Sequence, residues 1–188
     1  MSVIIKGGGN NVLADVDSVG NMMVTLEGQK VTYRVSSGNG GAGSLGIASL
    51  LIGSSTKKVK LIRIEFNCNA AASALVQVAI NKYSTTPSGG TSTTIAGVPN
   101  DSSDAAASAV YKSYTVNPTA GTLVGPMGTW VVAAPINSTA AFSNPVNVIN
   151  FSGGAGEKPI TLNNANECIG ITLSQAVFLN ITLVWTEE

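Results

Sequence analysis

Apolar side chains recur at every second position along most of this chain, most clearly near its C-terminus. Residues 178–185 carry large apolar side chains at four alternate positions, namely Leu179, Ile181, Leu183 and Trp185. A period of two is that of a β-strand, in which successive side chains point to opposite faces. We expect this apolar face to be buried, which would stabilise the fold by about 1.5–3 kcal/mol for each side chain.

Residues 58–66 differ, because apolar side chains lie on both faces towards the middle of the segment. One face would carry Lys58, Lys60, Ile62, Ile64 and Phe66, and the other Val59, Leu61, Arg63 and Glu65. This pattern predicts a central strand with one wetter side. With residues 75–81, it predicts two antiparallel strands joined by the flexible, small-residue loop 67–73. Residues 168–174 and 178–185 show a similar arrangement.

Further segments with strand patterns follow the same period and are separated by residues that favour turns. The predicted strands are 12–17, 22–26, 31–36, 47–52, 109–116, 129–134, 146–151 and 160–162, and the breakers are 38–43, 85–94, Asn117-Pro118, Asn144-Pro145 and 152–156. Many short strands between such turns predict an all-β fold, a jelly-roll-like antiparallel β-sandwich. Residues 101–109 allow at most one helical turn, with Asp101 or Asp104 as its cap.

The first 40 residues look separable from the sandwich, which we expect to span residues 41–188. Residues 12–26 predict a hairpin with its turn at 18–21, and the glycine-rich run 38–43 predicts a hinge. Two interpretations stay open: an N-terminal arm that docks on another molecule, or a hairpin that covers the edge of its own sheet. The N-terminus lacks the features of a signal peptide, so we expect synthesis and folding in a cytoplasm.

The amino-acid composition excludes several classes of function. Only 11% of the 188 residues are charged, with ten Lys+Arg against ten Asp+Glu, and there is no histidine. Glycine, serine, threonine and asparagine together supply 75 residues. The missing histidine excludes a Ser-His-Asp triad, a Cys-His dyad and a His-ligated metal. The zero net charge argues against a nucleic-acid partner, and no apolar run has the length of a membrane helix.

No residue pattern supports a catalytic, cofactor-binding or metal-binding site, and we assign none. The segment 15–20 resembles the start of a calcium loop, but Val19 and Leu26 stand where such a loop needs oxygen ligands, so a hairpin turn is the better interpretation. Asp101 and Asp104 are expected to close a turn onto their own backbone rather than to hold a cation. The remaining acids are scattered along the chain.

Lysines and cysteines have structural interpretations as well. Lys57, Lys58 and Lys60 form the only basic cluster, at the entry to a strand where lysines deter edge-to-edge aggregation; contact with an acidic partner is the alternative. Cys68 and Cys168 each belong to a strand pattern, so we expect two buried thiols. A disulfide between them would require their strands to be neighbours. Four aromatic side chains are expected in the core: Phe66, Trp130, Phe178 and Trp185.

Several phrases of the sequence resemble a known class of protein. They are residues 55–65, 83–94, 98–107, 114–125 and 181–188, with a weaker match at 14–23. Together they resemble small virion structural proteins of tailed bacteriophages, of the capsid decoration or cement type, over roughly residues 50–188. That family has no agreed catalytic motif, so no active residue carries over.

The resemblance implies a non-enzymatic jelly-roll subunit, a homotrimer, bound to the major capsid protein lattice on the outside of the head. It also implies a location on the virion surface after synthesis in the bacterial cytoplasm. An alternative is a receptor- or glycan-binding module at the tail or fibre, which would need a shallow aromatic or polar cleft with exposed tryptophan or tyrosine. The candidates for that role are Tyr83, Tyr111 and Tyr114. A carboxylate enzyme is a third class, which no residue pattern favours.

Overall fold

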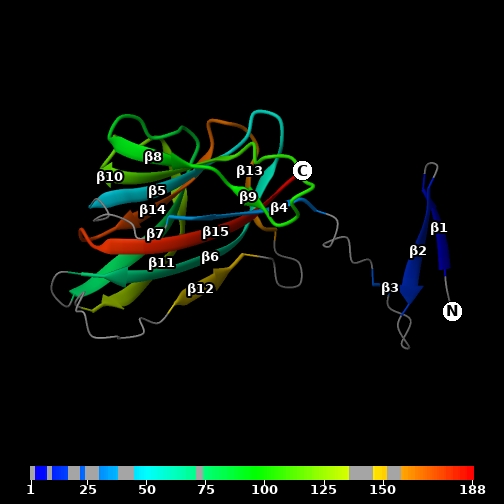
Figure 1. The fold of residues 1–188 in the computed structure, drawn as a ribbon, viewed down its shortest axis with the longest axis horizontal. Coiled ribbons are helices and arrows are strands. Elements are labelled where there is room, and N and C mark those ends of the chain that lie inside the picture. Colours follow the sequence, from blue (N-terminus) through cyan, green and yellow to red (C-terminus); the bar gives the residue numbers. More distant parts are fainter. Residues whose placement is uncertain are drawn as a thin grey trace. The chain divides into compact units, whose positions relative to one another are not determined.

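The computed structural model describes most of the chain as strands joined by turns (Figure 1). It describes the backbone of residues 3–7, 10–16 and 22–23, and the backbone and side chains of residues 30–37, 45–70, 74–135, 146–151 and 158–188. None of these residues lies in a helix that is long and apolar enough to cross a membrane. The chain divides into two compact units, Met1–Lys30 and Val31–Glu188.

The first unit is a small antiparallel sheet with the strand order β1-β2-β3. Its strands are β1 (Val3–Gly7), β2 (Asn10–Val16) and β3 (Met22–Met23). The pairing of β2 with β3 confirms a hairpin within residues 12–26, whereas β1 is a strand that the sequence pattern did not predict. The expected turn at 18–21 and the expected hinge at 38–43 lie outside the described residues.

The second unit begins earlier than the expected boundary at residue 40. Strand β4 (Thr32–Ser36) pairs with β15 (Phe178–Glu187), with Tyr33 opposite Trp185. This backbone pairing makes β4 a part of the sandwich, so the chain divides after Lys30.

The second unit consists of two antiparallel sheets, which confirms the expected all-β sandwich. One sheet has the order β11 (Leu123–Ala134), β7 (Ala74–Tyr83), β14 (Cys168–Leu173), β5 (Gly46–Ile52), β10 (Val110–Val116) and β8 (Thr91–Ile95). The other has the order β12 (Asn147–Asn150), β6 (Val59–Asn69), β15, β4 and β9 (Val98–Pro99), while β13 (Ile160–Leu162) also pairs with β6.

The strand pairs of the sandwich are nested along the chain. Strand β4 pairs with β15, β5 with β14, β6 with β12, and β7 with β11, all antiparallel. The expected hairpins are therefore wrong: β6 and β7 lie in different sheets, and so do β14 and β15. Both sides of β6 are occupied, by β15 on one and by β12 and β13 on the other, so β7 finds no free edge there.

A β-bulge explains why apolar residues lie on both predicted faces of β6. Opposite the neighbours Val184 and Trp185 of β15, the register on β6 passes from Arg63 to Leu61, so Ile62 is an extra residue. A bulge turns the following side chains to the other face. The buried residues of β6 are Val59 and Leu61 before the bulge, and Ile64, Phe66 and Cys68 after it. The central position predicted for this strand is confirmed.

The main core lies between the sheets and contains the apolar face predicted for β15. Trp185 is fully buried and stacks on Tyr33, with ring centroids 5.8 Å apart. Phe66 is buried as expected, but Trp130 and Phe178 are only partly buried, because they lie on the outermost strand and at the start of β15.

A second hydrophobic cluster contains buried side chains of the sheet formed by β5, β7, β10 and β14: Ile47, Leu50, Ile52, Tyr83, Tyr114 and Cys168. The ring of Tyr83 lies over Gly170, where an added Cβ would come within 2.8 Å of it. Cys168 belongs to this cluster and Cys68 to the main core, and both are buried thiols as expected.

Three segments depart from the sequence prediction. All of β8 except Ile95 lies in the breaker predicted at 85–94, and β11 begins at Leu123 rather than at 129, with two bulges beside Gly125 and Pro126. Residues 101–104 form a turn in place of a helical turn. The carboxylate of Asp101 accepts hydrogen bonds from the backbone N–H (2.9 Å) and the hydroxyl (2.7 Å) of Ser103, which confirms its expected turn-closing role.

We predict that Gly97→Ala destabilises the sandwich by about 1–3 kcal/mol, the usual cost of overpacking a core. An added Cβ at Gly97 would lie 2.5 Å from the ring of Trp185, which is fully buried and stacked and so has no room to move. The matched control is Gly125→Ala, because an added Cβ there meets no atom within 4 Å. Chemical denaturation measures the free energy of unfolding of both variants. Equal free energies of unfolding for the two variants would contradict the packing described for Trp185.

Candidate functional site

Charged side chains gather where β6 begins and β15 ends. Lys57 lies 3.5 Å from the carboxylate of Glu187, and Lys60 forms an ion pair with Glu188. On the neighbouring sheet Lys82 lies 3.3 Å from the carboxylate of Glu167. Two of the three clustered lysines therefore have acidic partners within the chain itself, at the strand entry that the sequence predicts for them.

Glu187 is the most enclosed charged side chain of this region, with a residue exposure of 5%. Its carboxylate accepts hydrogen bonds from the backbone N–H groups of Ser108 (3.0 Å) and Ala109 (2.9 Å). The hydroxyl of Ser108 (2.6 Å) and the indole N–H of Trp185 (3.2 Å) donate to it as well. A buried carboxylate is tolerated only when its oxygens are satisfied in this way.

These contacts determine the protonation of Glu187. Burial alone raises the pKa of a carboxyl group, but hydrogen bonds from Ser108, Ala109 and Trp185 outweigh burial and hold the pKa of Glu187 below its ordinary value of 4.5. The group is therefore ionised at neutral pH. A general acid or base works best with a pKa near the operating pH, so this environment fits a structural anchor instead.

Two hydrogen-bonded serine hydroxyls connect Glu187 to the turn before β6. The hydroxyls of Ser108 and Ser54 lie 2.8 Å apart, and because the single hydroxyl proton of Ser108 goes to Glu187, Ser54 donates to Ser108. Ser54 in turn accepts from the backbone N–H groups of Thr56 (3.1 Å) and Lys57 (3.2 Å). The network thus joins the turn before β6, the segment before β10 and the last strand.

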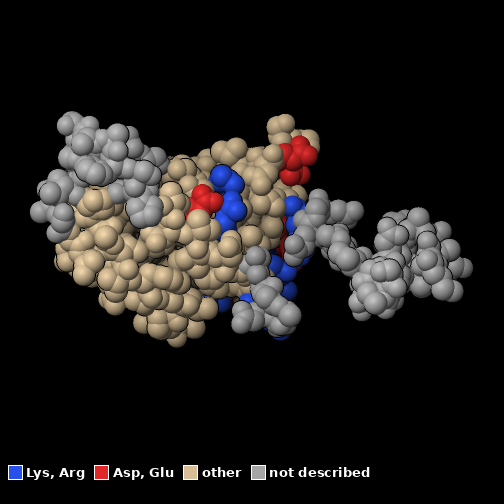
Figure 2. Space-filling view, turned by 90° about the horizontal axis from the view of Figure 1, so that it is seen from below, with Lys and Arg blue, Asp and Glu red and all other residues tan. Residues whose placement is uncertain are grey.

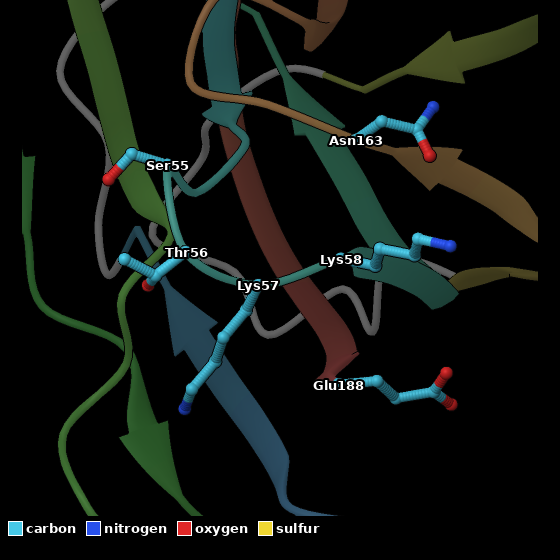
Figure 3. Close-up of a pocket in the computed structure, with 6 residues that line it drawn as sticks. All are labelled: Ser55, Thr56, Lys57, Lys58, Asn163 and Glu188. Carbon is cyan, nitrogen blue, oxygen red and sulfur yellow. The ribbon is translucent and has the colours of Figure 1, made fainter.

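A shallow pocket of about 500 Å³ lies beside this network (Figure 3). Its lining residues are Ser55, Thr56, Lys57, Lys58, Asn163 and Glu188. Figure 3 shows that these side chains do not converge: Lys57 points away from Lys58 and Glu188. In addition, the described residues contain no group of three or more acids or cysteines placed to hold a metal ion. The pocket therefore offers no arrangement of nucleophile, base and oriented substrate.

The three tyrosines proposed as carbohydrate platforms are buried, which corrects that expectation. Tyr83, Tyr111 and Tyr114 are 4%, 0% and 3% exposed. Tyr83 and Tyr114 belong to the second hydrophobic cluster, and Tyr111 belongs to the main core, where burial raises its pKa to about 12. A ring must be accessible to stack on a sugar, so these residues cannot serve a glycan-binding module.

The second candidate site is a surface, which we call the uncharged edge and define as strands β11 and β12. The 44 residues between Lys112 and Glu157 include both strands and contain no charged residue. Exposed large apolar side chains in and beside these strands are Leu75, Leu123, Val124, Met127, Val131, Val146 and Val148. Figure 2 views the molecule from below Figure 1, where β11 and β12 lie, and shows broad uncharged areas with charges confined to a few clusters.

The two bulges of β11 increase this exposure. The register skips Val124 and Met127, which are therefore the extra residues, and they are 61% and 44% exposed. A group of large apolar side chains that stays exposed in a single subunit marks a candidate protein–protein contact. Sequence reasoning missed this site, although the long run without charge is the signal that could have indicated it.

Comparison of the chain with models of protein families, with curated protein sequences and with solved structures gives no significant match.

We predict that Glu187→Gln lowers the free energy of unfolding by about 1–3 kcal/mol at neutral pH, because an amide offers one acceptor oxygen where the carboxylate uses two. Glu188→Gln is the matched control and should cost less than about 1 kcal/mol, because its ion pair with Lys60 is partly exposed. Urea denaturation of the three proteins measures both effects.

The comparison of wild type with Glu187→Gln also predicts how stability depends on pH. The folded-state pKa of Glu187 is lowered, so its stabilising contribution is present above pH 4.5 and is lost as the pH falls through the folded-state pKa. The difference between wild type and Glu187→Gln should therefore shrink below that pH. A difference that stays constant down to strongly acidic pH would show that ionised Glu187 is not the anchor.

Proposed function

We propose that this protein is a non-enzymatic structural subunit of a tailed-bacteriophage virion, which binds the outside of the capsid as a decoration or cement protein and stabilises the head. The observation that carries the proposal is the uncharged edge with its exposed apolar side chains. The phrases that resemble virion structural proteins support the same assignment. Its partner would be the major capsid protein lattice, and its location the virion surface after synthesis in the host cytoplasm.

The nested strand pairs support a finer description of the fold, the jelly roll. In this arrangement the first strand pairs with the last, the second with the last but one, and so on inward. The pairs β4–β15, β5–β14, β6–β12 and β7–β11 follow that order, with β8, β9 and β10 inserted between the members of the innermost pair. Jelly-roll sandwiches are common in virus capsid proteins.

The uncharged edge suits attachment to a protein lattice. Burying its exposed valine and leucine side chains would remove apolar surface from water, and these side chains lose less rotamer entropy on contact than long charged ones do. Binding would then depend on close packing and backbone hydrogen bonds, with little contribution from charges that salt could screen. A lattice repeats each contact many times, so a modest patch gains avidity.

We predict that the purified protein cosediments with mature, expanded heads of its phage at a fixed stoichiometry. Because β11 and β12 carry no charged residue, the affinity should change by less than about tenfold between low and high salt. Protein that remains in the supernatant with these heads would contradict the proposal.

A matched pair of variants tests which surface makes this contact. Val148 of β12 is 52% exposed and lies opposite Glu65, so Val148→Lys places a cation beside an acid and should leave the fold intact. Val116 of β10, 54% exposed, is the control. We expect Val148→Lys to release the protein from heads and Val116→Lys to bind as wild type. Equal binding by both variants would remove β12 from the contact.

A further inference from the structure

We draw no further inference here: the strongest candidate, the outer edge of strand β11 at the end of its sheet, carries no proposal, because residues 136–145, which follow this strand, lie outside the described residues and nothing in the structure shows what covers the edge.

Discussion

The sandwich depends on the burial of its last strand. Strand β15 lies between β6 and β4, and its side chains Leu179, Ile181, Leu183 and Trp185 are all at most 4% exposed. The strand then ends in Glu187, whose carboxylate joins the segment before β10 and, through Ser108 and Ser54, the turn before β6. Because β15 pairs with strands far earlier in the chain, the second sheet is complete only when the whole chain is present. Non-local pairing of this kind makes folding slow compared with helical proteins.

The sequence predicts the strands well and their partners poorly, for a physical reason. A period of two depends on local alternation of burial, so it identified β4, β5, β10, β14 and β15 within a few residues. Pairing depends on which edges stay open after all strands have formed, and no local pattern contains that information. The bulge at Ile62 is partly visible in the sequence, because apolar residues lie on both predicted faces of β6. The sequence pattern alone does not show whether both faces are buried or whether the buried face changes at a bulge.

The same distinction holds for the candidate sites. The buried thiols and the turn at Asp101 could be predicted, because they depend on the residue type and its immediate sequence neighbours. The anchor at Glu187 could not be predicted, because its donors come from residues almost 80 positions earlier. The tyrosines were misplaced because tyrosine fits both wet and dry surroundings, and only the sheet order shows that Tyr83 and Tyr114 belong to a buried cluster.

The charged and the uncharged parts of this sandwich have different roles. Lysines and acids meet where β6 begins, and there they fix the turn and the chain end to each other. The uncharged edge has no such internal use for its exposed valines and leucines, whose hydration is unfavourable in an isolated subunit. In this fold the charged groups pair within the chain while an apolar edge stays exposed. Association with a partner would stabilise such a fold, because it removes the apolar edge from water.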